Sequence, residues 1–228
     1  MIPKVVFKFD KEKDLHNIWQ TVNAKTSFGY DFKKNIPEQI IKICKNKEFN
    51  FCKKELNKKL KKLYQHHSIK IQIETLNKSW KIIEKEYFKR LEKITKYKFK
   101  FKNSYGYLTT FARCPYNYKI PYFYVNFFNS QLGELKTVGH ELMHIHLHNS
   151  PWWNKVKEEL GNQKTHDLKE ALTELLNSEF RDLWIVDDLS YPNHIKLREY
   201  ITKQWKREKN FEELTNKCIK WVKTNGVK

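Results

Sequence analysis

The stretch on which the interpretation of this chain depends is Val138-Gly139-His140-Glu141-Leu142-Met143-His144. Residues four apart on a helix lie one turn apart on one face, so the imidazoles of His140 and His144 can reach the same metal ion. Apolar residues recur at helical spacing over 131–149, and Pro151 follows, where a helix cannot simply continue. The sequence therefore predicts a helix over 131–149 that carries a zinc site.

Glu141 follows the first histidine of this pattern. A carboxylate in that position can act as a general base on a water molecule activated by a metal ion. A catalytic zinc site needs a third protein ligand, with the remaining position open to water. The extended motif His-Glu-x-x-His-x-x-Gly-x-x-His would supply the third ligand from a histidine at 150, with glycine at 147. This chain has Leu147 and Ser150 at these positions. The third ligand is therefore expected from another element.

Two carboxylates are available on the next major helix, which the apolar spacing predicts over 165–182. Glu170 and Glu174 are one turn apart, so both would lie on the same face of that helix. One of them could bind the metal while the other orients His140 through a hydrogen bond. The residues by themselves leave open which glutamate has which role.

With these residues the chain resembles the gluzincin metallopeptidases, the thermolysin-like superfamily, whose second motif is commonly Asn-Glu-x-x-Ser-Asp. The segment Lys169-Glu170-Ala171-Leu172-Thr173-Glu174 matches that motif at Glu170 and, by acid type, at Glu174. Lys169 replaces the asparagine, and Glu174 replaces the aspartate. The resemblance implies a small soluble zincin-like peptidase that binds Zn²⁺ through His140, His144 and Glu170. In this assignment Glu174 supports a ligand histidine.

A second resemblance is to the ImmA/IrrE-type cytoplasmic peptidases, which cleave regulatory proteins. It is carried by His140-Glu141-Leu142-Met143-His144-Ile145-His146-Leu147-His148. In that group the downstream glutamate segment usually continues with Ala-Asn and a Phe-Ala pair, whereas here it reads Glu170-Ala171-Leu172-Thr173. The ImmA/IrrE kinship is therefore the alternative, with a regulatory protein as its substrate.

Peptide hydrolysis also requires a hydrogen-bond donor for the developing oxyanion. Tyr191-Pro192-Asn193-His194 follows the glutamate helix, and gluzincins often use tyrosine or histidine for this role. Tyr191 and His194 are therefore candidate catalytic residues beside Glu141. An ordinary loop with a packed tyrosine and a surface histidine explains the same residues equally well.

The patterning around the motif predicts an α+β fold with a small mixed or antiparallel sheet. One strand is expected near the N-terminus, and the alternation of Ile69, Ile71 and Ile73 predicts another over 68–74. The sheet is assigned to 97–127, with strands at 97–101, 105–112 and 122–127. Strand 122–127 or a neighbour is expected to be an edge strand that pairs with extended peptide substrate.

A helix through Val22 is expected, with Asp10 or Asp14 as its N-cap. Further helices are expected at 37–44, 51–64, 77–96, 151–161, 193–207 and 211–222. The chain then divides into a basic, mainly helical region, 1–96, and a zincin-like catalytic region, 97–228. Within the second region the active-site helix at 131–149 is followed by the glutamate helix at 165–182. The two regions are expected to form one compact unit.

The net charge of +19 is unevenly distributed. Residues 1–130 carry 29 Lys and Arg against 11 Asp and Glu, whereas residues 131–228 carry 16 against 15. A basic surface can bind nucleic acid. The alternative function is therefore a nucleic-acid-binding protein with a non-catalytic metal site. No nucleic-acid-binding motif accompanies the charge, so solvated lysine-rich helix faces are the favoured interpretation.

Composition also bears on location and partners. No run of eighteen apolar residues and no secretory signal is present, so a cytoplasmic protein without membrane attachment is expected. The four cysteines include no C-x-x-C pair and are expected to be reduced. The partner predicted by the motif is a peptide or protein substrate, and the sequence does not predict the oligomeric state.

Overall fold

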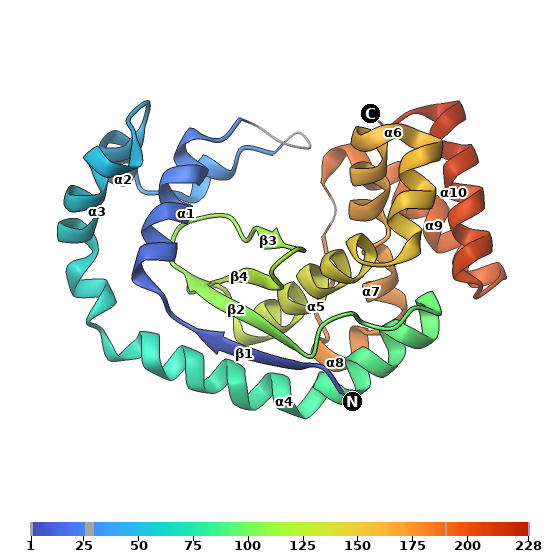
Figure 1. Ribbon diagram of the computed structural model, residues 1–228, viewed down its shortest axis with the longest axis horizontal. Coiled ribbons are helices and arrows are strands. Elements are labelled where there is room, and N and C mark those ends of the chain that lie inside the picture. Colours follow the sequence, from blue (N-terminus) through green and yellow to red (C-terminus); the bar gives the residue numbers. More distant parts are fainter. Residues whose placement is uncertain (1, 26–29, 190, 228) are drawn as a thin grey trace.

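The computed structural model describes residues 2–25, 30–189 and 191–227. The fold is α+β and mostly helical, with one small mixed sheet of strand order β1-β2-β4-β3 (Figure 1). The strands are β1 (Lys4–Lys8), β2 (Asn103–Thr109), β3 (Tyr116–Asn117) and β4 (Tyr122–Asn126). The pairs β1–β2 and β2–β4 are parallel, and β3 is antiparallel to β4. The sheet therefore ends in a short antiparallel edge strand.

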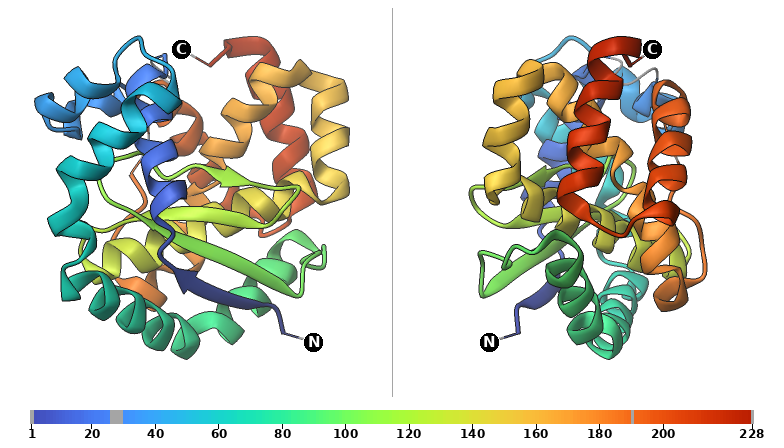
Figure 2. Two further views of the ribbon diagram at one scale, coloured as in Figure 1. Left: turned by 60° about the vertical axis from the view of Figure 1, so that its left-hand side comes forward. Right: turned by 90° about the vertical axis from the view of Figure 1, so that its right-hand side faces the viewer.

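Helices surround the sheet. They are α1 (Lys11–Asn23), η1 (Phe32–Asn35), α2 (Glu38–Cys44), α3 (Phe49–Tyr64), α4 (His67–Thr95), α5 (Gln131–His148), α6 (Pro151–Ala171), α7 (Glu174–Glu179), α8 (Arg181–Trp184), η2 (Pro192–His194), α9 (Ile195–Arg207) and α10 (Phe211–Asn225). Figures 1 and 2 show α1–α3 at one end of the sheet and α6, α9 and α10 at the other, with α4 running along the base. The element that carries the motif, α5, lies centrally and contacts α4, α6 and β4.

Side chains of opposite character cover the two faces of the sheet. One face packs into the main core with α4 and α5, through Val5, Phe7, Leu108, Phe123 and Val125. The other face carries four tyrosines and is only partly covered. Lys8 and Lys13 lie over three of their rings at 4.1–4.9 Å, an arrangement typical of cation–π contacts. The apolar face is what holds α5 in place.

The strand predicted over 68–74 is wrong, because these residues form the first turns of α4. Ile69, Leu76 and Trp80 are buried at the spacing of one helix face, while Ile71 is exposed. The alternating isoleucines therefore belong to the same helix that was predicted to begin at residue 77, and this helix begins at His67. The side chain of His66 caps the helix by accepting a hydrogen bond from the Ser68 amide.

The predicted sheet also differs from the observed one in two ways. Residues 97–101 are not a strand; Phe99 is buried there and packs against Phe88 of α4 and His146 of α5. The N-terminal β1 joins the sheet, so the sheet draws on both predicted regions of the chain. The edge-strand prediction named strand 122–127 or a neighbour. Strand β4 lies inside the sheet, and its neighbour β3 is an edge strand.

The glutamate helix predicted over 165–182 is interrupted. The observed α6 runs from Pro151 to Ala171, with Gly161 at φ 73° making a kink within it, and α7 begins only at Glu174. A left-handed backbone conformation of this kind favours glycine. Glu170 and Glu174 therefore lie on two different helices, and the prediction of one continuous face for both is wrong.

A buried carboxylate joins the N-terminal helices to the sheet. Asp14 on α1 accepts hydrogen bonds from the Thr109 hydroxyl, from the amide and hydroxyl of Thr110, and from the Tyr64 hydroxyl. These partners belong to α3 and to the end of β2. The basic N-terminal helices are thus tied directly to the sheet.

Two further expectations concern the chain as a whole. All four cysteines are free, as expected. None of the helices within the described residues is long and apolar enough to cross a lipid bilayer.

Candidate metal centre

Helix α5 is held from both ends and from behind. Ser130 caps its N-terminus by accepting a hydrogen bond from the Gly133 amide, and the helix ends at His148 before Pro151. Gly139 faces two aromatic rings: the Tyr87 hydroxyl donates to its carbonyl at 2.6 Å, and an added Cβ would lie 2.6 Å from Trp184. The lack of a side chain at 139 lets these rings pack directly behind His140.

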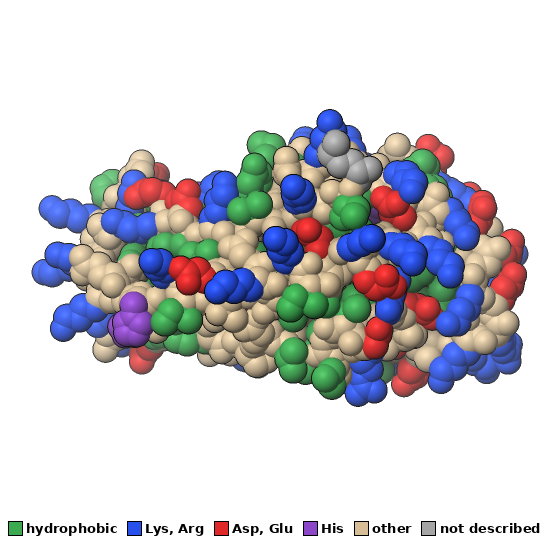
Figure 3. All heavy atoms as spheres, turned by 90° about the horizontal axis from the view of Figure 1, so that it is seen from below, with side chains coloured by type: hydrophobic (Ala, Val, Ile, Leu, Met, Phe, Trp, Pro, Cys, Tyr) green, Lys and Arg blue, Asp and Glu red, His purple; other side chains and the backbone are tan. Residues whose placement is uncertain are grey.

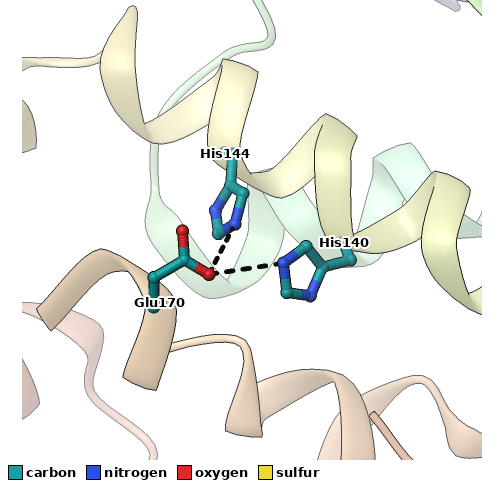
Figure 4. Close-up of side chains that lie close together, drawn as sticks. All are labelled: His140, His144 and Glu170. Atoms are coloured by element: carbon teal, nitrogen blue, oxygen red, sulfur yellow. Dashed lines mark hydrogen bonds and ion pairs between the residues drawn. The ribbon is translucent and has the colours of Figure 1, made fainter. Parts of the chain in front are cut away.

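Three of the predicted site residues come together. Oε2 of Glu170 lies 3.2 Å from Nε2 of His144 and 3.5 Å from Nε2 of His140 (Figure 4). The ligand atoms of all three residues lie within 4.8 Å of one another. The two imidazoles come from successive turns of α5, and the carboxylate comes from the end of α6. This group could hold a metal ion.

The residue that orients His140 is not the one predicted. Nδ1 of His140 lies 3.0 Å from Oδ1 of Asp188, in the loop that follows α8. Glu174 instead accepts a hydrogen bond from Arg198 at 2.9 Å and belongs to the surroundings of α9. Arg198 also donates to Oδ2 of Asp188. Glu174 is therefore connected to His140 only through Arg198 and Asp188. Asp188 was not predicted, because it lies in a loop 44 residues beyond the motif, and no local sequence pattern marks it.

The second oxygen of Glu170 has its own partner. Lys169 donates from Nζ to Oε1 of Glu170 at 2.7 Å and to the Tyr116 hydroxyl at 2.7 Å. The Tyr116 hydroxyl also lies 2.8 Å from Nε2 of His148. Lys169, the departure from the gluzincin pattern, is therefore a buried contact of the third ligand. Tyr116 lies on edge strand β3, a segment to which the sequence analysis assigned no element.

The electrostatics of the site favour a bound cation. Burial alone would raise the pKa of Glu170, but His144 and Lys169 outweigh it and hold that pKa well below its usual range. Burial lowers the pKa of His144 to about 3, which leaves its imidazole neutral and able to act as a ligand. Burial opposes the charged form of His140, yet Asp188 and Glu170 raise its pKa to about 10. The carboxylates thus attract positive charge to the position of His140.

Glu141 lies in the same buried environment. Burial raises its pKa to about 8, and the nearby carboxylate of Glu170 contributes in the same direction. Glu141 as a residue is 7% exposed, so it is almost entirely shielded from solvent. A carboxyl group in such a setting can exchange a proton with a small molecule bound beside it.

Tyr191 and His194, the two candidate oxyanion donors, are placed differently. Burial raises the pKa of Tyr191 with further contributions from Glu170 and Glu141, so its hydroxyl lies near the site. The centroid of the Tyr191 ring lies 6.4 Å from the ring centroid of Tyr30 and 6.4 Å from that of Phe32. Nε2 of His194 lies 3.1 Å from Oδ1 of Asp167. His194 is therefore engaged by another residue of α6.

A third candidate donor was not predicted. Burial raises the pKa of Tyr116, with Glu170 and Glu141 contributing, and its ring centroid lies 5.1 Å from that of His144. Tyr116 and Tyr191 thus both lie close to the carboxylates of the site. The Tyr116 hydroxyl accepts from Lys169, a contact that strengthens it as a donor, and its other neighbour is Nε2 of His148 at 2.8 Å.

Comparison of this chain with protein-family models, with curated proteins and with solved structures finds no match. No relative therefore assigns a role to any residue of the centre.

Proposed function

We propose that this protein is a zinc-dependent metallopeptidase of the gluzincin type. The observation that carries the proposal is the position of Glu170 Oε2, 3.2 Å from one imidazole nitrogen and 3.5 Å from the other. Donors bonded to zinc at 2.0–2.2 Å in a tetrahedron lie roughly 3.4 Å apart. Two imidazoles and one carboxylate form a known catalytic zinc set that leaves one position open.

The residues around this set have separate tasks in peptide hydrolysis. A bound zinc ion would lower the pKa of a water molecule and polarise the carbonyl of the scissile bond. Glu141 would accept a proton from the attacking water and transfer it to the leaving amine. Tyr191 or Tyr116 would donate a hydrogen bond to the oxygen on which negative charge develops. His194, whose Nε2 lies 3.1 Å from Oδ1 of Asp167, is the third candidate for this role.

The sheet is consistent with a zincin-like arrangement. Edge strand β3 contacts α5, and Tyr116 on this strand lies beside His144. An extended peptide could add to the outer edge of β3, which would bring its backbone close to the ligands. The substrate in this proposal is therefore a peptide or an unfolded protein segment.

Two alternatives follow from the sequence. An ImmA/IrrE-like regulatory protease would use the same zinc and the same general base, and would differ in cleaving a folded regulatory partner. A nucleic-acid-binding protein with a non-catalytic metal would keep the ion but would not need Glu141. The choice between catalysis and metal binding alone therefore depends on Glu141.

The test uses the whole chain, purified with zinc, and a fluorescent casein substrate. We expect one zinc per chain in the wild type, no retained zinc in His144→Ala, and a full complement in Glu141→Gln. Hydrolysis by Glu141→Gln should fall at least a hundredfold, because the proton transfer has lost its base. The matched control is His67→Ala, an exposed histidine on α4, which should change neither property. Full activity in Glu141→Gln would contradict the proposal.

A further inference from the structure

The outward face of α4 carries a continuous row of lysines. Their spacing of three or four residues places them on one side of the helix. They are Lys78, Lys81, Lys85, Lys89, Lys93 and, at the C-cap, Lys96. Eighteen residues at a rise of 1.5 Å give this α4 lysine row a length of about 27 Å. Seven residues of 78–96 are exposed, and all but Ile82 belong to the row.

The row attracts two nearby carboxylates without direct contact: Lys81 acts on Glu84, and Lys89 acts on Glu86. Among the described residues, no member of the row forms an ion pair or a hydrogen bond through its ammonium group. The acidic residues of this part of α4 are engaged elsewhere. Glu84 accepts from the Val5 amide and from Trp80, Glu86 pairs with Arg90, and Glu92 pairs with Lys98.

The surface beside the row is hollowed. Lys89 and Lys93 border two depressions of about 380 and 460 Å³. Lys96 and Lys209 line the first together with Arg90, Glu86 and Glu179, and Lys85 and Lys98 line the second together with Glu92. Lys209 pairs with Glu179, and Lys98 pairs with Glu92. Figure 3 shows the underside of the molecule, the side on which α4 lies, with lysine and arginine side chains spread over it. The row is therefore bordered by two depressions in which basic side chains outnumber the glutamates.

We propose that the α4 lysine row binds the phosphate backbone of double-stranded nucleic acid without reading its sequence. A straight row of about 27 Å matches roughly eight base pairs of duplex at 3.4 Å per pair. Lysine serves as a point charge for phosphate and does not impose base recognition. None of the exposed residues of 78–96 is aromatic, which disfavours binding of single strands by base stacking.

An anionic membrane is the less favoured partner. Helices that bind at a membrane surface insert a broad apolar face between the lipid headgroups. Here the exposed stripe offers Ile82, at 83% exposure, surrounded by lysines. The inference does not depend on the proposed peptidase activity, because no residue of the row belongs to the metal centre.

The experiment compares two triple variants of equal charge. Lys85→Gln/Lys89→Gln/Lys93→Gln removes the middle of the row. Lys54→Gln/Lys58→Gln/Lys61→Gln removes three exposed lysines of α3 at similar spacing, with the same loss of charge. Binding to a 20-base-pair fluorescein-labelled DNA duplex of arbitrary sequence is measured by anisotropy at several salt concentrations. Zinc content and thermal unfolding confirm that each variant is folded.

We expect the α4 variant to bind at least tenfold more weakly at low salt. Its plot of log K against log salt should be less steep by about three, since each lost phosphate contact removes about 0.9 from the slope. The α3 variant should retain most of the affinity and most of the slope. Equal losses in the two variants would overturn the proposal, because binding would then reflect overall charge. Dependence on the row for phosphatidylserine vesicles but not for duplex would overturn it as well.

Discussion

The ammonium group of Lys169 lies 2.7 Å from Oε1 of Glu170, its neighbour in the chain. The other oxygen, Oε2, is the one that faces His140 and His144. Lys169 is only 2% exposed and has no other acceptor in the described contacts than Glu170 and Tyr116. The buried lysine thereby leaves the glutamate one oxygen for a metal and directs it toward the imidazoles.

Replacement of Lys169 by methionine should change how Glu170 binds the metal. Without the ammonium group, Oε1 has no buried donor and becomes free to compete for the same ion. We expect the visible absorption spectrum of the Co²⁺-substituted protein to differ from that of the wild type. Hydrolysis should fall by roughly ten- to a hundredfold, the usual effect of losing a partner of a metal ligand.

The control for this change is Lys169→Arg, which keeps a donor for Oε1. The arginine variant should restore most of the wild-type Co²⁺ spectrum. Tyr116→Phe is the companion variant, because it removes the second contact of Lys169 while leaving its pairing with Glu170. An unchanged spectrum in Lys169→Met would show that Lys169 does not direct the ligand.

Asp188 and Glu174 can be distinguished by one pair of isosteric changes. Asp188→Asn removes the charge that faces Nδ1 of His140, so we expect zinc affinity to fall by about ten- to a hundredfold. Glu174→Gln alters a residue that contacts Arg198 rather than His140, and its effect on affinity should be several times smaller. Competition with a chromogenic chelator measures both values. A larger loss in Glu174→Gln would contradict the assignment of Asp188.

Gly139→Ala should destabilise the protein by about 1–3 kcal/mol, because the new methyl group would meet the Trp184 ring in a filled core. Denaturant unfolding of the metal-free protein measures the change in the free energy of unfolding. Gly133→Ala on the same helix is the control. Its methyl group would lie 3.1 Å from the Ser130 hydroxyl at the helix end, where a small shift is feasible. Equal destabilisation by the two substitutions would argue against specific packing behind His140.

Glu134 makes stability depend on pH. Burial raises its pKa from 4.5 to about 8 in the folded state. Between these values the unfolded chain loses the proton while the folded protein keeps it, so stability falls as pH rises through this window. The decline approaches about 1.4 kcal/mol per pH unit for this group. Below pH 4.5 the contribution is fully present, and above pH 8 no more is lost.

The variant that tests this dependence is Glu134→Gln, which cannot ionise. Relative to the wild type, it should gain stability by a few kcal/mol between pH 5 and pH 8.5. Urea unfolding at both pH values, with the two proteins in the same metal-free buffer, measures the difference. A constant difference between the proteins at the two pH values would contradict the raised pKa.

The sequence determined the elements whose side-chain pattern is local. Two histidines one turn apart require only a helix, and the apolar spacing of 131–149 with Pro151 beyond it predicts that helix within about a residue. Glu170 was named from its motif register, and it lies within reach of both histidines. These predictions succeeded because they depend on neighbours no more than a few residues away, or on a short motif.

Tertiary structure decided the contacts that join distant segments. Asp188 reaches His140 across 48 residues, and Tyr116 reaches Lys169 across 53. Nothing in the local pattern of either segment specifies its partner. The parallel pairing of β1 with β2 likewise joins residues about a hundred positions apart.

The same distinction explains the wrong strand at 68–74. Three isoleucines at alternating positions satisfy a strand period and, in part, a helical stripe. The burial of Leu76 and Trp80 on the same side selects the helix, and their burial depends on the sheet and α5 being in place. The sequence thus specified a helix whose two histidines could share a metal ion, while the packing of remote segments selected the groups that contact these histidines and Glu170.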